Sequence, residues 1–263
     1  MAKYKVLFLD IDGTILREDH TIEESTKIAV SQAKAQGIEV FLATGRPLHE
    51  ISNIAEQLDI TSFIGYNGAY ALYQDNVIVN EPMPAEMIEQ YLQTADENQH
   101  EMILYTKQLN LLTTTEAESV QQFIKYFALQ DVKLYGNEYV NDILGITIMN
   151  VEPDQPSLYH FQNEDIYLSQ VNVAGLEHCY DVIRENVNKG IATRKILEKL
   201  NISPDEAIAF GDGMNDKQML SYVGNSFAMG NATPELLKYA RYQTTTVEDS
   251  GIYNGLKTLG IIK

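Results

Sequence analysis

The chain has 263 residues, 44% of them apolar, which is enough for one large core or two domains and excludes a disordered composition. Acidic residues outnumber basic ones by 37 to 19, and the formal charge of −18 disfavours a general attraction to nucleic acid or to an anionic membrane. An anionic substrate would therefore need locally placed positive groups.

The first apolar run of the chain ends at Asp10 and is too short for a signal-peptide core or a membrane span, so we expect a cytoplasmic protein. Cys179 is the single cysteine, which excludes an intrachain disulfide and any multi-cysteine metal site. We expect it to be a packing residue. No sustained heptad or exposed apolar stripe indicates a particular oligomeric state.

The first predicted strand, Val6–Leu9, is a short apolar run followed by Asp10-Ile11-Asp12-Gly13-Thr14. If the extended geometry continues past the strand, Asp10 and Asp12 project the same way and their carboxyls share one small space. By itself this stretch also fits a polar turn, because Asp and Gly favour turns. An EF-hand calcium loop is disfavoured, since Thr14-Ile15 breaks the register of its ligands.

A helix is predicted next, because Thr21 and Glu24 have the spacing of a capping box. Its apolar face would carry Ile22, Thr26, Ala29, Val30 and Ala33, with Gly37 ending the helix in a left-handed cap. A second buried strand is predicted over residues 38–43.

The second strand leads into Thr44-Gly45-Arg46-Pro47, a hydroxyl and a glycine at the start of a helical segment. Amides at a helix start favour anions, Thr44 can donate a hydrogen bond, and Arg46 adds positive charge, so the segment suits a phosphate. A capped helix with an exposed arginine is the alternative.

The middle of the chain changes character after a third strand at 62–66 and a hairpin formed by 69–73 and 77–79. From Ala85 onward the pattern predicts a helix, strands at 102–105 and 109–113, a helix ending at Phe127, and strands at 143–149 and 166–173. We therefore predict an inserted α+β domain over residues 83–185, with residues 1–82 and 186–263 forming the surrounding domain.

The α/β alternation resumes with a helix that begins near Lys189-Gly190 and ends at Asn201. Lys189 stands where the helix dipole disfavours a cation, so either a nearby anion holds it or it is an ordinary surface lysine. A buried strand at 207–210 then ends in Gly211-Asp212-Gly213-Met214-Asn215-Asp216. A helix at 217–223, a strand within 226–231 and helices at 234–240 and 251–259 complete the chain.

These strand ends converge in a doubly wound parallel sheet, because such a sheet places the carboxyl ends of its strands along one edge. The four aspartates Asp10, Asp12, Asp212 and Asp216 would repel one another unless a hard cation lay between them. Oxygen ligands favour Mg²⁺, whereas the absence of a His/Cys cluster disfavours zinc. Together with Lys189 they fit phosphoryl transfer to an aspartate.

The four motifs, in this order, resemble the haloacid dehalogenase (HAD) superfamily, and within it the Cof-type phosphatases with a large type IIB cap. The pair formed by Asp10–Thr14 and Gly211–Asp216 carries most of the resemblance, which covers essentially the whole chain. It implies a Rossmann-like core of residues 1–82 and 186–263 and a cap of residues 83–185. One departure is Ser250, which separates Glu248-Asp249 from Gly251 where relatives have a continuous Glu-Asp-Gly.

The resemblance also implies roles for individual residues. Asp10 would be the nucleophile that becomes an aspartyl-phosphate, and Asp12 the acid that protonates the leaving oxygen and later activates water. The implied phosphate-binding residues are Thr44, Gly45, Lys189 and Asn215, with Arg46 toward the substrate. The implied Mg²⁺ ligands are Asp10, Asp12 through its backbone carbonyl, and Asp212, with Asp216 as a ligand or a support of the metal shell.

The function this implies is a Mg²⁺-dependent phosphatase of small phosphorylated metabolites, such as sugar phosphates, with neither nucleic acid nor membrane as a partner. An acidic residue at Asp12 favours hydrolysis over the stable aspartyl-phosphate of ion-pumping relatives. A phosphomutase of the same superfamily, or a metabolite-binding regulatory protein on the same fold, is the alternative.

Overall fold

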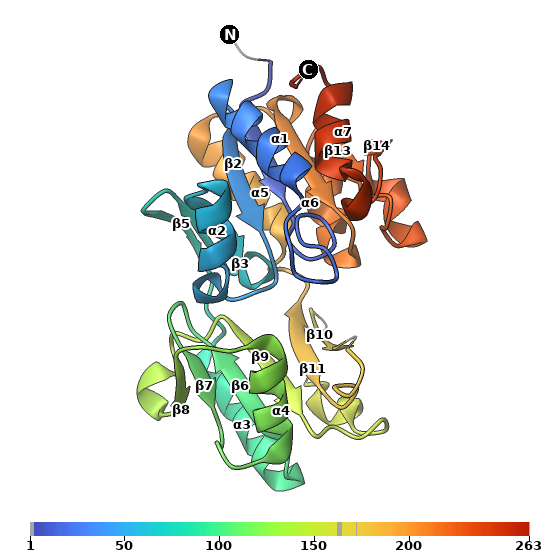
Figure 1. Cartoon of the computed structure of the whole chain (residues 1–263). Helices are drawn as coiled ribbons and strands as arrows, with labels where there is room; N and C mark the ends of the chain where they lie inside the picture. The colour runs from blue at the N-terminus through green and yellow to red at the C-terminus, as the bar shows by residue number, and fades with distance from the viewer. Residues whose placement is uncertain (1–2, 162–164, 172, 263) are drawn as a thin grey trace. The chain divides into compact units, whose positions relative to one another are not determined.

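The computed structural model describes residues 3–161, 165–171 and 173–262, which divide into two units, each with its own sheet (Figure 1). The first unit comprises residues 3–46, 51–80 and 187–262. The second comprises Pro47–Glu50 and the described residues of Glu81–Asn186. The second unit therefore takes one short segment from just after the second strand, in addition to the long central part of the chain.

The first unit is built on an eight-stranded sheet in which the strand pairs from β14 to β3 are parallel, while β4 and β5 add an antiparallel hairpin at one edge. The central strands are fully buried apolar runs, as expected of parallel strands covered on both faces. In sheet order the strands are β14 (Tyr242–Gln243), β13 (Asn225–Ala228), β12 (Ala207–Gly211), β1 (Val6–Leu9), β2 (Glu39–Ala43), β3 (Ser62–Gly65), β4 (Tyr70–Tyr73) and β5 (Asn76–Asn80).

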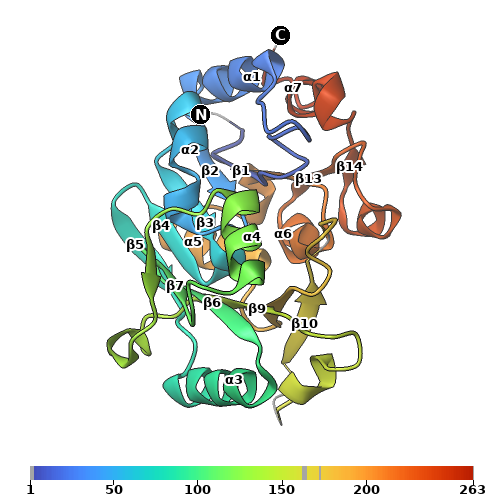
Figure 2. The same cartoon turned by 60° about the horizontal axis from the view of Figure 1, so that its bottom comes forward.

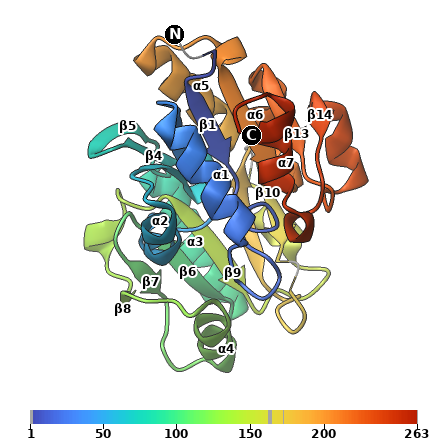
Figure 3. The same ribbon diagram turned by 45° about the horizontal axis from the view of Figure 1, so that its top comes forward.

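Helices cover both faces of this sheet. Figures 1 and 3 show α1 and α7 side by side on one face, and α5 and α6 lie on the other, where Ile196 and Met219 join Phe8 and Phe41 in one apolar cluster. The strand ends are left for loops that carry polar side chains. The helices of this unit are α1 (Glu24–Ala35), α2 (Ser52–Leu58), α5 (Lys189–Leu200), α6 (Lys217–Tyr222) and α7 (Gly251–Thr258).

The second unit is a six-stranded mixed sheet with α3 (Ala85–Asn98) and α4 (Glu118–Phe127) on opposite faces (Figure 2). Its strand pairs are antiparallel except for β7 with β8. In sheet order the strands are β10 (Ile166–Gln170), β11 (Tyr180–Arg184), β9 (Gly145–Met149), β6 (Glu101–Tyr105), β7 (Asn110–Leu112) and β8 (Val132–Leu134). The order of the strands in the sheet differs from their order in the chain, so some strands pair with strands that are distant in sequence.

The predicted capping box at the start of α1 is wrong. The helix begins at Glu24, with Glu23 as N-cap, while Thr21 donates its hydroxyl to Asp19 at 2.6 Å. The aspartate two residues upstream takes the hydroxyl that would have capped the helix. Ile22 therefore lies outside the helix, in a bridge with Leu16. Gly37 does adopt the expected left-handed conformation, with φ 78°.

Three short strands were not predicted, namely β8, β11 and β14, and the helix expected at 234–240 is a 3₁₀ helix over Pro234–Tyr239. The strand expected over 166–173 ends at Gln170, and position 172 lies outside the described residues. Among the helices of the described ranges, none combines the length and the apolarity needed to cross a membrane.

Candidate active site

The ammonium group of Lys189 is the centre of a buried charge cluster in the first unit. Its Nζ donates to Asp10 Oδ1 at 2.6 Å and to Asp216 Oδ1 at 2.7 Å, and the side chains of Lys189 and Asp216 are both 0% exposed. Asp10 follows β1, Asp216 lies between β12 and α6, and Lys189 is the first residue of α5. Three distant segments therefore meet at one edge of the sheet, as the sequence predicted.

The start of α5 explains how a lysine tolerates this position. Asn188 is the N-cap and accepts a hydrogen bond from the amide of Ile191 at 3.0 Å. The helix dipole opposes a cation at its first residue, but two carboxylates in contact with Lys189 outweigh that effect. The anion that the sequence left unidentified is thus, in this structure, the pair Asp10 and Asp216.

Asp212 completes the cluster. One carboxylate oxygen from each of Asp10, Asp212 and Asp216 lies within 4.8 Å of the others. Thr14 donates to Asp212 Oδ1 at 3.2 Å, and Gly13, at φ 80°, lies so close to the Asp212 carboxylate that any β-carbon would collide with it. Glycine is therefore required after Asp12 both for its backbone angle and for space.

The carboxylates of this cluster carry more negative charge than the Lys189 ammonium alone neutralises. Burial raises the pKa of Asp10 well above its usual value, and the charges of Asp216 and Asp212 raise it further, while Lys189 lowers it. Burial, followed by Asp216, raises the pKa of Asp212 to about 6. Burial disfavours the charge of Lys189, yet the attraction of Asp10 and Asp216 leaves its pKa raised.

These residues fit a divalent cation. The set offers only oxygen ligands, three carboxylates face a single ammonium, and the pKa values of Asp10 and Asp212 are raised, so a further positive charge would favour ionisation of all three. Asp216 is the least available for direct ligation, because Oδ1 accepts from Lys189 and Oδ2 accepts from the amides of Asp212 and Gly213 at 3.1 and 3.2 Å.

Asp12 has a different environment from Asp10. β1 ends at Leu9, so the extended geometry does not persist, and the Asp12 side chain is 53% exposed. Arg46 holds it with two bonds, from Nε to Oδ2 at 2.8 Å and from Nη2 to Oδ1. Asp10 is buried beside Lys189, whereas Asp12 is largely exposed and paired with Arg46, so the two carboxyls have different surroundings. The sequence analysis predicted that Arg46 faces the substrate, whereas the structure pairs it with Asp12.

Thr44, Gly45 and Asn215 are brought together around Asn67, which sequence reasoning missed as a site residue. The Asn67 amide donates to the Thr44 carbonyl at 3.1 Å, its side chain lies 3.0 Å from where a β-carbon of Gly45 would stand, and Asn215 donates to its Oδ1 at 3.4 Å. Asn67 has a left-handed backbone, with φ 52°. The sequence analysis assigned no site role to the residues between the third strand and the hairpin, although a turn at the carboxyl end of β3 also faces the ligand edge.

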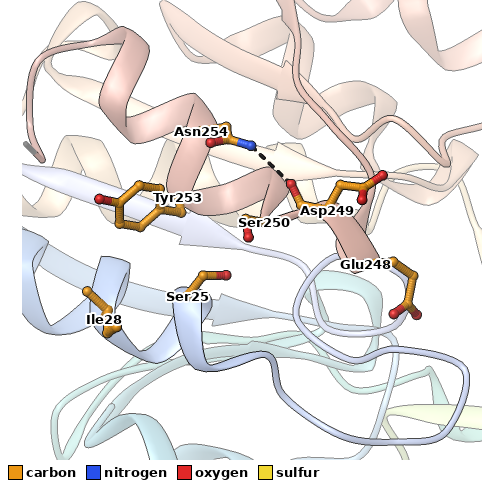
Figure 4. A pocket seen from close by; sticks show the side chains of 7 residues that line it. All are labelled: Ser25, Ile28, Glu248, Asp249, Ser250, Tyr253 and Asn254. Atoms are coloured by element: carbon orange, nitrogen blue, oxygen red, sulfur yellow. Dashed lines mark hydrogen bonds between the residues drawn. The ribbon is translucent and has the colours of Figure 1, made fainter.

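A hollow of about 570 Å³ between α1 and α7 is separate from this cluster (Figure 4). It is lined by Ser25, Ile28, Glu248, Asp249, Ser250, Tyr253 and Asn254. None of the aspartates that approach Lys189 lines it, so concavity alone does not locate the chemistry in this unit.

Comparison with known proteins finds matches over nearly the whole chain. A family model described as haloacid dehalogenase-like hydrolase matches residues 7–256. YkrA of Bacillus subtilis strain 168, a provisionally named phosphatase, is 33% identical over 98% of this chain and 99% of its own length.

Solved structures agree with the sequence matches. A protein from Geobacillus kaustophilus HTA426 is 29% identical, with a TM-score of 0.90 over 98% of this chain and 100% of that one. The sugar phosphatase BT4131 of HAD subclass IIB is 26% identical, with a TM-score of 0.83 over 98% of this chain and 100% of its own. A mostly parallel core sheet with a second mixed sheet is the arrangement of that subclass.

Proposed function

Because the chain belongs to the haloacid dehalogenase-like hydrolase family, we propose that it hydrolyses phosphate monoesters of small metabolites with Mg²⁺, through an aspartyl-phosphate on Asp10. The observation that carries this proposal is the buried contact of Lys189 with Asp10 and Asp216, beside Asp212. A purely structural ion pair would not need a third carboxylate within 4.8 Å.

Asp10 is the proposed nucleophile. Its carboxylate oxygen attacks phosphorus, and the bond from phosphorus to the ester oxygen breaks. Lys189 keeps the Asp10 carboxylate oriented and offsets part of its repulsion toward an incoming phosphate. An ammonium has three donors, and the bonds to Asp10 and Asp216 use two, so one donor can serve a phosphoryl oxygen.

Asp12 is the proposed acid and base. As an acid it gives its proton to the leaving ester oxygen, and as a base it takes a proton from the water that attacks the aspartyl-phosphate. The bond between phosphorus and Asp10 then breaks, which releases inorganic phosphate and restores the carboxylate. While Arg46 donates to both carboxylate oxygens, Asp12 cannot donate a proton, so we propose that this pair loosens when substrate binds.

Thr44 and Asn215 are proposed to bind the phosphoryl group with Lys189. The Thr44 hydroxyl accepts from the Arg46 amide at 3.0 Å, which leaves its own hydrogen to donate to a phosphoryl oxygen. Gly45 exposes backbone beside it, and Asn67 fixes the relative places of these groups. Asn67 is thus proposed as a positioning residue of the phosphate site.

Mg²⁺ would be held by Asp10, Asp212 and the backbone carbonyl of Asp12, with Asp216 supporting them through Lys189 and the amides of Asp212 and Gly213. When bound, the ion neutralises charge on the carboxylates and on the phosphoryl group. We assign Asp216 a supporting role because its two carboxylate oxygens already have protein partners.

We propose that the substrate is a small phosphorylated metabolite, with sugar phosphates as the first candidates. We propose that the second unit is the cap domain. The support is the match over 98% of the chain to BT4131, a sugar phosphatase of subclass IIB. Because the chain carries a net charge of −18, the positive groups that bind a phosphate must be local, and Lys189 and Arg46 are the ones we propose.

The proposal is tested by phosphate release from a panel of sugar phosphates, nucleotides and other small monoesters, with Mg²⁺ and with EDTA. We expect release with Mg²⁺ only, and loss of release in Asp10→Asn. Asp75→Asn, at an exposed turn between β4 and β5, is the matched control and should keep full activity. Activity of Asp10→Asn at the level of the control would remove Asp10 as nucleophile.

Product analysis in the same assay separates hydrolysis from isomerisation. A phosphatase releases one inorganic phosphate for each ester consumed, whereas a phosphomutase conserves total ester and moves its position. Binding of the panel without either change would support the third possibility, a metabolite-binding protein on this fold.

A further inference from the structure

Residues 229–233, which follow β13, form a turn that touches both aspartate-bearing loops of the site; we call it the brace turn. The Met229 amide donates to the Gly211 carbonyl at 3.0 Å, and the Thr233 amide donates to the Asp212 carbonyl at 3.2 Å. Main-chain bonds therefore fix the Asp212 loop from the brace turn. These bonds do not depend on side-chain identity, so the sequence gives no sign of them.

Asn231 extends the same turn to the other loop. Its Nδ2 donates to the Gly13 carbonyl at 2.8 Å, and its Oδ1 accepts from the Val247 amide at 3.0 Å. One amide side chain thus joins the turn after Asp12 to the segment before α7. Asparagine suits this place because it offers a donor and an acceptor on one short, planar group.

The segment that holds Val247 is itself fixed by local bonds. Thr245 Oγ1 and Asn254 Nδ2 both donate to the Asp249 carbonyl, at 2.7 and 3.0 Å, and Figure 4 shows the second of these bonds. Ser250, the departure from the family's Glu-Asp-Gly, has a left-handed backbone with φ 62°. The loop around Ser250 is therefore held by its own hydrogen bonds, and it can serve as an anchor.

A second link between the two segments is weaker. Arg17 pairs with Glu248 at 3.1 Å, but the Glu248 side chain is 56% exposed, and exposed ion pairs contribute little. Asn231, by contrast, binds the carbonyl of the residue that directly follows Asp12, so any shift of that peptide moves the proposed acid.

We propose that Asn231 is a positioning residue that anchors the Asp12–Gly13 turn to the segment before α7 and thereby sets the place of Asp12. The expected effect on catalysis rests on the proposed function, whereas the anchoring of the turn does not depend on it. Asn231 touches neither the clustered carboxylates nor Lys189 in the described hydrogen bonds, so its effect would pass through Gly13.

Two variants remove different sets of the hydrogen bonds that the Asn231 side chain makes. Asn231→Asp keeps the acceptor for Val247 but loses the donor to Gly13, and Asn231→Ala loses both. With p-nitrophenyl phosphate as the probe, we expect kcat to fall about fivefold in both, as for loss of one hydrogen bond, with KM within about twofold of the wild type. Agreement between the two variants excludes the added charge as the cause.

A readout without metal or substrate tests the anchoring directly. Amide hydrogen exchange of the peptide spanning residues 12–16, followed by mass spectrometry in EDTA, should be about fivefold faster in both variants. Asn53→Asp and Asn53→Ala, at an exposed position of α2, are the controls and should match the wild type in both measurements.

The outcomes decide the proposal. Wild-type kcat and exchange in Asn231→Asp would overturn it, and so would a fall in activity that disappears after correction for the folded fraction. If the wild type released no phosphate from any ester, the proposed function would fail, while the exchange measurement would still decide whether Asn231 anchors the turn.

Discussion

Replacing Asp212 by asparagine should stabilise the metal-free protein at neutral pH while removing its activity. Asn keeps an oxygen to accept the bond from Thr14 and removes one of three carboxylates that crowd within 4.8 Å. Two like charges at that separation repel by about 3.5 kcal/mol at an effective dielectric constant of about 20. The same substitution would weaken Mg²⁺ binding, because it removes a charged ligand.

The pKa of Asp212 gives an independent magnitude. A rise from 3.8 to about 6 corresponds to about 3 kcal/mol between the two protonation states. Partial exposure of Asp212 screens this cost, so we expect a gain in the free energy of unfolding of about 1–2 kcal/mol at pH 7.5. The folded protein binds this proton more tightly than the unfolded chain, so the penalty grows as pH rises from about 3.8 to about 6.

Urea unfolding in EDTA, followed by circular dichroism, measures this gain. The advantage of Asp212→Asn should be full at pH 7.5 and about half as large at pH 5. Excess Mg²⁺ should reverse the order, since the tighter binding of the ion stabilises the wild type more than the variant. Asp75→Asn should be neutral throughout. If Asp212→Asn is no more stable than the wild type at pH 7.5 in EDTA, the carboxylates do not repel as described.

Three further substitutions probe single contacts. Asp12→Asn should lower phosphate release by about 10²–10⁴-fold while Mg²⁺ affinity by calorimetry stays within a few fold; comparable losses in both would assign Asp12 to binding. Lys189→Met leaves Asp10 and Asp216 buried without a cation and should cost about 3–5 kcal/mol in urea unfolding at pH 7.5 in EDTA, and an unchanged midpoint would contradict the buried pairing. Arg46→Lys loses the two-bond hold on Asp12, and because we propose that this pair loosens when substrate binds, kcat and KM should stay within about twofold of the wild type. A fall of about tenfold in kcat would contradict the loosening, and a rise in KM alone would place Arg46 on the substrate.

The fold was predictable where a strand is both apolar and followed by a distinctive turn. β1, β2 and β12 satisfy both conditions, because both faces of a parallel sheet are covered. β8 was missed because its residues are exposed, and β11 because Asp181 separates its two buried residues, Tyr180 and Val182, so that it has no sustained apolar run. The capping box failed because Asp19, two residues upstream, competes for the Thr21 hydroxyl.

The site was predictable as a set of residues but not as a set of contacts. The convergence of Asp10, Asp212, Asp216 and Lys189 follows from topology, since parallel strands end at one edge. The partner of Arg46 does not follow, because topology brings Arg46 to the same edge as several carboxylates and does not show which of them it pairs with.

Asn67 and Asn231 show why the supporting residues escaped detection. Each acts through one side-chain amide on a group far away in sequence: Asn67 accepts from the Asn215 side chain, and Asn231 donates to the Gly13 carbonyl. An isolated asparagine after a strand is most simply explained by local turn chemistry. The long-range bond is visible only once the strand ends are brought together. Residues that hold a site in place are therefore harder to find from one sequence than the residues that would react, because their spacing encodes nothing about their partners.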